Sequence, residues 1–238
     1  MSIITKAFGG VKFSVRSDRQ NDEEVVREVF LNDVYRLVNL KDRGLNPKFI
    51  IDVGGHIGTF ASKCKTLWPN SQIVAFEPVK ENAQMYRRTM QLNGFTGVTV
   101  INKGINYDAE RTVFVNGVTA TGGGMFIKPQ DLERCVSSGK YKLDTEILWS
   151  TLEEELEGFS FDKIELAKFD CEGGEREAFR GMTSDLLGKI GFIVGEFHVS
   201  DCVGKEFAEK YMCRFHHKVI IPKGYEDRKL GIFYAEPI

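Results

Sequence analysis

The stretch Ile50-Ile51-Asp52-Val53-Gly54-Gly55-His56-Ile57-Gly58 decides how this chain of 238 residues is interpreted. An apolar run leads into an acid and then into glycines, which is typical of a strand that turns into a helix at the carboxyl edge of a parallel sheet. Glycine at positions 54 and 55 permits a tight turn and lets the backbone approach a bound molecule without an intervening Cβ. Gly58 lets the following helix begin close to the sheet. The stretch therefore predicts a ligand-binding loop.

Short apolar runs alternate with amphipathic stretches after this loop. The alternation predicts strands at 49–53, 72–76, 98–102, 164–169 and 191–197, separated by helices at 57–67, 80–92, 152–156, 175–182 and 205–212. Continuous apolar strands between helices indicate a parallel sheet that is covered on both faces. Two further strands, at 218–221 and 230–234, are joined by a polar turn. The fold class is therefore α/β, with a doubly wound, mostly parallel sheet that ends in a C-terminal β-hairpin.

Two segments, residues 1–47 and about 104–142, follow the alternation of strands and helices less well. Residues 1–47 form a lead-in with helical spacing of apolar residues between 22 and 40, which Asn32-Asp33 can break. An irregular insertion is expected at about 104–142, with one strand at 112–115 and glycine-rich loop around Gly122–Gly124. We expect one domain over residues 1–238, with its core at 49–238.

Charge and cysteine content exclude several classes of protein. The formal net charge is −2 and basic residues are scattered, so no nucleic-acid partner is predicted. Five cysteines without a C-x-x-C pair argue against a disulfide framework and a zinc ribbon. No apolar run approaches the roughly 18 residues that span a membrane. The first residues lack the apolar segment of a signal peptide, so a cytoplasmic location is expected.

Two kinds of nucleoside cofactor could bind to this loop. A dinucleotide requires G-x-G-x-x-G, whereas the spacing here is Gly54-Gly55-x-x-Gly58 with Asp52 just before it. A carboxylate at that position repels a pyrophosphate but suits the positively charged amino end of S-adenosylmethionine, directly or through water. Glu77, after the second strand, can accept hydrogen bonds from ribose hydroxyls of either cofactor. The expected cofactor site consists of Asp52, Gly54, Gly55, His56, Gly58, Glu77, Pro78, Asn102 and Asp170.

Three motifs together resemble the FkbM-type family of S-adenosylmethionine-dependent methyltransferases. They are Ile51–Gly58, Phe76-Glu77-Pro78 and Lys168-Phe-Asp-Cys-Glu-Gly-Gly-Glu175, whose Asp170-x-Glu172-Gly173-x-Glu175 is similar to the family's D-x-E-G-x-E signature. The resemblance covers about 49–198 and departs from the family where Gly55-His56 replaces the commoner Ala-Asn. It implies a seven-stranded class I methyltransferase fold and O-methylation of hydroxyl groups on sugars or polyketide-like metabolites.

A second group of polar residues follows the later strands. Asp170 ends a strand beside the cofactor strand, and Lys168 shares its face, where it can lower the pKa of Asp170 or orient an acceptor. His198 is the natural base candidate because of its ordinary pKa, and Glu196 can orient it. Asp170, His198 and Lys168 are the expected catalytic residues, and Glu172, Glu175 and Glu196 face the acceptor. The spacing of Asp170, Glu196 and His198 gives no specific support for a metal, so none is predicted.

The sequence favours an O-methyltransferase that acts on a small molecule or a glycan. Two alternatives remain open at this point. The first is a nicotinamide-dependent oxidoreductase, against which the glycine spacing and the terminal hairpin count. The second is a binding protein that retains the fold without catalysis, against which Asp52, Glu77 and Asp170 count, although fold alone does not fix function.

Overall fold

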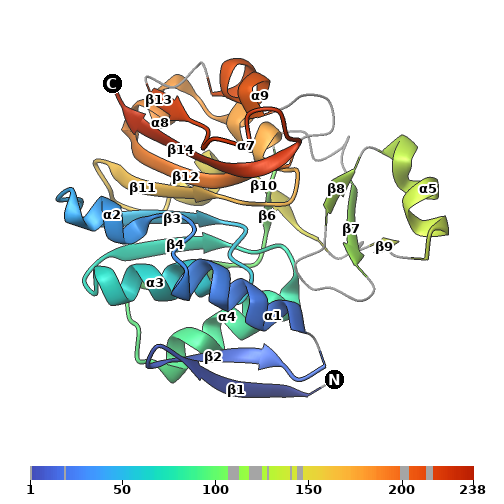
Figure 1. Ribbon diagram of the computed structural model, residues 1–238, viewed down its shortest axis with the longest axis horizontal. Coiled ribbons are helices and arrows are strands. Elements are labelled where there is room, and N and C mark those ends of the chain that lie inside the picture. Colours follow the sequence, from blue (N-terminus) through green and yellow to red (C-terminus); the bar gives the residue numbers. More distant parts are fainter. Residues whose placement is uncertain are drawn as a thin grey trace.

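A central sheet organises the chain, as the computed structural model in Figure 1 shows. The structure describes residues 2–18, 20–106, 113–117, 125–127, 129–139, 141–143, 147–198, 204–212 and 217–238. Seven strands lie in the order β13-β14-β12-β11-β3-β4-β5. Their bounds are β3 Phe49–Val53, β4 Gln72–Phe76, β5 Val98–Ile101, β11 Ile164–Phe169, β12 Ile190–His198, β13 His217–Ile220 and β14 Leu230–Pro237.

The pairing of these strands confirms the expected fold class. Strands β5, β4, β3, β11 and β12 run parallel, while β14 is antiparallel to both β12 and β13. The chain leaves β3 toward β4 and β5 and later returns to the other side of β3 as β11. A doubly wound sheet binds its ligands at the carboxyl ends of the strands where this order reverses. The loops after β3 and β11 therefore flank the place where a site is expected.

Helices cover both faces of the sheet. Alternate residues of each strand point to opposite faces, and the helices bury both sets. Ile50 packs with α2 (Leu37–Asp42), α3 (Thr59–Leu67) and α4 (Lys80–Leu92). Ile51 packs against the face that α6 (Leu152–Leu156), α7 (Glu175–Gly181), α8 (Ser184–Lys189) and α9 (Gly204–Tyr211) cover. Figure 1 shows these two layers on either side of the strands. Among the helices of the described ranges, none has the length and apolarity to cross a membrane.

The N-terminal lead-in contains a β-hairpin that the sequence did not lead us to expect. Strands β1 (Ile3–Phe8) and β2 (Val11–Arg16) pair in antiparallel fashion around Gly9 and Gly10, which both have positive φ angles, of 53° and 85°. Such a two-residue turn matches the twist of the strands it joins. The predicted helical segment follows as α1 (Gln20–Val25) and a π-helical turn η1 (Val26–Leu31). It breaks after Asn32, as predicted, before α2 begins.

A buried ion pair attaches this hairpin to the rest of the molecule. Arg16, at the end of β2, has a fully buried side chain whose Nη1 donates to Asp22 of α1 at 2.9 Å. Its Nη2 donates to the Asn82 side chain of α4. Around this pair, Phe13 and Val15 pack with Phe30 and Met85 in a core of their own. The hairpin is therefore an integral layer beside α4.

The insertion is more regular than expected. Strand β6 (Gly104–Ile105) pairs with β10 (Trp149–Ser150). A separate antiparallel sheet has the order β8-β7-β9, with β7 at Val113–Gly117, β8 at Met125–Ile127 and β9 at Tyr141–Leu143, and the turn η3 (Pro129–Asp131) and α5 (Leu132–Ser137) accompany it. The predicted strand at 112–115 thus falls largely on β7. The predicted glycine-rich loop at 122–124 lies outside the described residues.

Replacing Arg16 tests how strongly the hairpin is attached. Arg16→Ala removes the guanidinium that neutralises the buried carboxylate of Asp22, so we expect the free energy of unfolding to fall by about 3–5 kcal/mol. Urea unfolding followed by circular dichroism measures it. Lys12→Ala, on the exposed face of the same strand, is the matched control and should cost less than about 0.5 kcal/mol. Equal effects of the two changes would contradict the interpretation.

Candidate active site

The loop after β3 is folded tightly against the neighbouring strand ends. The N–H groups of Gly54 and Gly55 both donate to the carbonyl of Phe76, at 2.9 and 3.0 Å. Gly54 has a φ of 82°, and a Cβ there would lie 1.8 Å from the carbonyl oxygen of Asp170. A Cβ at Gly55 would lie 2.6 Å from the ring of Tyr86. The missing side chains thus make room for the protein's own chain at both positions, whereas we had expected them to make room for a bound molecule.

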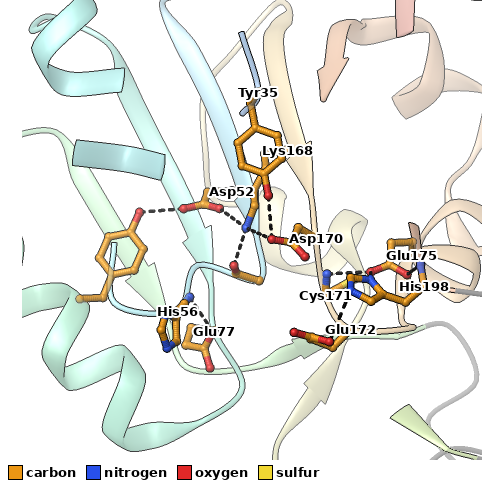
Figure 2. A network of polar contacts seen from close by, with 12 residues as sticks. Tyr35, Asp52, His56, Glu77, Lys168, Asp170, Cys171, Glu172, Glu175 and His198 are labelled. Atoms are coloured by element: carbon orange, nitrogen blue, oxygen red, sulfur yellow. Dashed lines mark hydrogen bonds and ion pairs between the residues drawn. The ribbon is translucent and has the colours of Figure 1, made fainter. Parts of the chain in front are cut away.

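A buried lysine connects the loop to both strands that flank it (Figure 2). Lys168 of β11 is the register partner of Asp52 of β3. Its Nζ donates to the carbonyl of Gly54 at 2.5 Å and lies 3.3 Å from Asp52 Oδ1 and 3.6 Å from Asp170 Oδ2. Burial alone would lower the pKa of Lys168, but the two carboxylates outweigh it and raise the pKa. Lys168 is therefore charged, and its ammonium group contacts Gly54, Asp52 and Asp170 of the protein itself.

Asp52 is completely buried in this arrangement. Its Oδ2 accepts a hydrogen bond from the Tyr86 hydroxyl at 3.1 Å, and its Oδ1 faces Lys168. Burial raises the pKa of Asp52, and Lys168 opposes that shift. The carboxylate therefore supports the loop from beneath, and its contact with a cofactor stays a prediction.

Glu77 closes the other side of the loop. It follows β4, is 4% exposed, and accepts hydrogen bonds from the backbone N–H groups of His56 at 2.8 Å and Val79 at 2.9 Å. Burial raises the pKa of Glu77 to about 7 despite these donors. The amide of Asn102 donates to the carbonyls of Glu77 and Pro78, at 2.8 and 2.9 Å. The predicted cofactor residues of β3, β4 and β5 therefore meet at one edge of the sheet.

His56 turns away from this edge toward the N-terminal segment. Its backbone is left-handed, with a φ of 47°, and its Nε2 lies 3.5 Å from Asp22 of α1. Burial lowers the pKa of His56 to about 4, against the opposing charge of Asp22. The ring is therefore neutral near pH 7. It connects the predicted cofactor loop to the buried pair of Asp22 and Arg16.

Asp170 lies between the lysine and a second group of polar side chains, as Figure 2 shows. The hydroxyl of Tyr35 donates to its Oδ2 at 2.7 Å. Burial would raise the pKa of Asp170, but Lys168 and then His198 outweigh it and lower the pKa. Asp170 is therefore ionised, and its side chain remains 23% exposed. The effect of Lys168 on Asp170 is the one that the sequence suggested.

His198 is held by Glu175, where we expected Glu196 to orient it. Glu175 is 1% exposed and accepts from the N–H groups of Cys171 and Gly173, at 2.8 and 3.2 Å, and its Oε1 lies 3.1 Å from His198 Nδ1. Glu172, at a left-handed φ of 55°, lies 3.4 Å from His198 Nε2. Burial would lower the pKa of His198, but Glu175 and then Glu172 raise it to about 10. His198 therefore carries a proton at neutral pH here, which differs from the base we expected.

Asp170, Glu196 and His198 converge although they are distant in sequence. One ligand atom from each lies within 4.8 Å of the others. Burial raises the pKa of Glu172 to about 8 and that of Glu196 to about 7, and the negative charge of Asp170 adds to both shifts. The residues expected to face an acceptor are thus gathered at the carboxyl ends of β11 and β12. No sequence spacing indicated this triad because two different strands supply it.

Three residues of the site were not predicted. Tyr35, Tyr86 and Asp22 contact Asp170, Asp52 and His56 respectively. Their immediate sequence gave no signal of a site, because Asp22 stands beside two glutamates and Tyr86 is followed by two arginines. Their partners lie far along the chain, so only the fold brings them together.

The sheet order is that of a class I methyltransferase fold. The METTL16 MTase domain superposes with a TM-score of 0.52 at 11% identity, over 89% of this chain and 67% of that one. The precorrin-6y C5,15-methyltransferase of Geobacter metallireducens gives 0.50 at 14% identity, over 85% and 87%. At these identities the likeness concerns the fold.

The chain belongs to the FkbM methyltransferase domain family, whose model matches residues 52–218. "Methyltransferase 1" of Beauveria bassiana is 24% identical over 184 residues, which cover 73% of this chain and 72% of that protein. The hexuronic acid methyltransferase AglP of Haloferax volcanii is 28% identical over 193 residues, which cover 78% and 71%. The protein is therefore an S-adenosylmethionine-dependent methyltransferase, and the nicotinamide and non-catalytic alternatives are set aside.

Gly54→Ala tests the tight approach of the cofactor loop to Asp170. Gly44→Ala is a matched control, because Gly44 has a similar φ of 92° but no neighbouring atom within 4 Å of its added Cβ. We expect the control to lose about 1–2 kcal/mol of unfolding free energy from the left-handed backbone alone. Gly54→Ala should lose about 3 kcal/mol more, since a backbone atom must move. Urea unfolding measures both, and similar losses would argue against the close contact.

His56→Asn tests the buried neutral histidine, because asparagine tolerates the left-handed backbone. The pKa of His56 is lower in the folded chain, so as pH falls the unfolded chain takes up the proton first. The contribution of neutral His56 to the stability of the folded chain is therefore complete above about pH 6.5, and it is lost as pH falls toward 4. Between pH 7 and 5 the unaltered protein should lose about 2 kcal/mol more unfolding free energy than the variant. Parallel slopes for the two proteins would contradict this.

Proposed function

We propose that this methyltransferase transfers the methyl group to a hydroxyl oxygen of a small molecule or glycan. One observation carries the proposal, namely the cluster of Asp170, Glu172, Glu196 and His198 directly beside the cofactor loop. A neutral hydroxyl loses its proton during methylation, and so it needs a general base at the reacting atom. A site lined by carboxylates at the ends of β11 and β12 provides them.

The residues around the loop fit the cofactor. S-adenosylmethionine supplies an electrophilic methyl group when it is bound. Glu77 is placed to accept hydrogen bonds from its ribose, and Gly54, Gly55, His56, Gly58, Pro78 and Asn102 shape the surface on which it lies. Asp52 acts through Lys168, which fixes the carbonyl of Gly54 and the side chain of Asp170. In this proposal Lys168 is a positioning residue, because its contacts with the protein occupy it.

Asp170, Glu172 and Glu196 receive the acceptor. The acceptor oxygen forms its bond to the methyl carbon while its O–H bond breaks, and the proton leaves through a carboxylate of this cluster. S-adenosylmethionine bound at the loop would supply the methyl group and would keep the electron pair of the carbon–sulfur bond on its sulfur. Alignment of the reacting atoms is the main contribution of the protein, as it is for displacement reactions in general. Tyr35 and Lys168 hold Asp170 in place for this step.

A sugar is the acceptor class that we favour. The Haloferax volcanii relative is named as a hexuronic acid methyltransferase, which supports a carbohydrate. Figure 1 shows the small sheet of β7, β8 and β9 beside the central sheet, and we assign it to the acceptor side. The single-domain organisation, the cytoplasmic location and the absence of a nucleic-acid partner remain predictions of the sequence.

Binding of S-adenosylhomocysteine tests the cofactor assignment. Calorimetry should show binding that millimolar NAD does not displace. Glu77→Ala should weaken it by about 1–3 kcal/mol, because a hydrogen bond to a charged group is lost. Asp185→Asn, an equally conservative loss of charge on the distant α8 where Asp185 is 81% exposed, is the control and should bind as the unaltered protein does. Thermal unfolding of each variant separates lost binding from lost folding.

Methyl transfer from labelled cofactor to hexuronic acids, neutral sugars and polyketide alcohols then tests the acceptor. We expect label on a hydroxyl oxygen of a sugar, and Asp170→Asn should lower kcat by at least about 100-fold, in the range of a lost acid–base group. Label on nitrogen or carbon acceptors alone would overturn the proposal, while the binding of S-adenosylhomocysteine would stand.

A further inference from the structure

The strand order brings three metal-ligating side chains to one point. Phe169 of β11 pairs with Gly195 of β12, so Asp170 and Glu196, the residues that follow them, lie side by side at the carboxyl edge. His198 lies two residues after Glu196 and therefore on the same face of β12. The ligand atoms of the three residues lie within 4.8 Å of one another. One ion can be reached by all of them.

His198 is prepared for such a role by the residue behind it. Glu175 is almost completely buried and binds Nδ1, while the N–H groups of Cys171 and Gly173 fix its own carboxylate. A carboxylate on one ring nitrogen of a metal-bound histidine orients the ring and selects the other nitrogen as the ligand. Nε2 is therefore the nitrogen that faces the cluster, where Glu172 lies 3.4 Å away. Glu175 therefore contacts His198 and orients its ring without itself facing the cluster.

The balance of charge around the cluster also favours a cation. Lys168 pairs with Asp170, and His198 pairs with Glu172 and Glu175, whereas among the described residues no cationic side chain pairs with Glu196. Lys168 also neutralises Asp52. Partly buried carboxylates that remain unpaired destabilise a folded protein, and coordination of a metal is one of the ways in which they are compensated.

We propose that Asp170, Glu196 and His198 bind one divalent cation, with two carboxylate oxygens and Nε2 as ligands, and that Nε2 releases its proton to solvent when the ion binds. A mixed set of oxygen and nitrogen ligands suits Mn²⁺, which lies between the ions that prefer carboxylates and those that prefer imidazole. Three protein ligands leave coordination positions for water or for an acceptor oxygen. That last role rests on the proposed function, since a cation there stabilises the negative charge that develops on the acceptor oxygen. Binding of the ion itself does not depend on it.

Titration of Mn²⁺ into the cofactor-free protein tests the site, with calorimetry and electron paramagnetic resonance as readouts. We expect one Mn²⁺ per chain. Glu196→Gln retains the shape of the side chain and should weaken binding at least about tenfold, the lower limit seen even for residues that support a metal ligand. His198→Gln should abolish the electron spin-echo modulation from a directly bound nitrogen. Asp185→Asn is again the control and should leave the affinity unchanged.

The outcomes separate this inference from the proposed function. Absence of stoichiometric Mn²⁺ binding, or equal affinity in the unaltered protein and Glu196→Gln, overturns the metal site. Binding without a nitrogen signal overturns the assignment of His198. If S-adenosylhomocysteine binds in the presence of a chelator while Mn²⁺ does not bind, the methyltransferase proposal stands and the metal site falls. If Mn²⁺ binds as expected but no hydroxyl acceptor is methylated, the metal site stands alone.

Discussion

The contact on which the site depends is the buried ammonium of Lys168 between Asp52 and Asp170. Two parallel strands end at the same height, each with a carboxylate, and repulsion between them would push the strand ends apart. The lysine removes this repulsion and also holds the carbonyl of Gly54. As a result, one charged group fixes the loop after β3 relative to the cluster of Asp170, Glu172, Glu196 and His198. Such a group is costly to bury alone, and it is tolerated because both partners surround it.

From this contact the two halves of the site differ in character. On the side of β3 and β4, backbone N–H groups donate to the carboxylate of Glu77 and the amide of Asn102 donates to its backbone carbonyl, so these polar groups are held in place. On the side of β11 and β12, carboxylates face one another and one imidazolium, so the charge is less well compensated. A rigid half suits a cofactor of constant shape. The half at β11 and β12, where negative charge is less well compensated, suits a bound group that is positively charged or that gives up a proton.

The central sheet could be predicted from the sequence because each strand and each helix has its own periodicity of apolar residues. The bounds of β3, β4, β11 and α4 agree with the expected ranges at 49–53, 72–76, 164–169 and 80–92. The hairpin β1–β2 was missed although Gly9-Gly10 between alternating residues is a recognised turn signal. In the site, Asp52, Glu77 and Asp170 were found because each ends a strand. The holding of His198 by Glu175 was not, since a residue that begins a helix gives no sign that its carboxylate turns back toward another strand.

The N-terminal segment has a consequence for how relatives of this protein are compared. The family match begins at residue 52, yet Asp22 contacts the cofactor loop through His56, and Tyr35 holds Asp170. A chain shortened to the matched region would lose both contacts and would expose Met85 and Ile57, which the hairpin layer covers. Comparisons with relatives should therefore include the segment upstream of the matched region. The segment before the matched region supplies two direct contacts to the site.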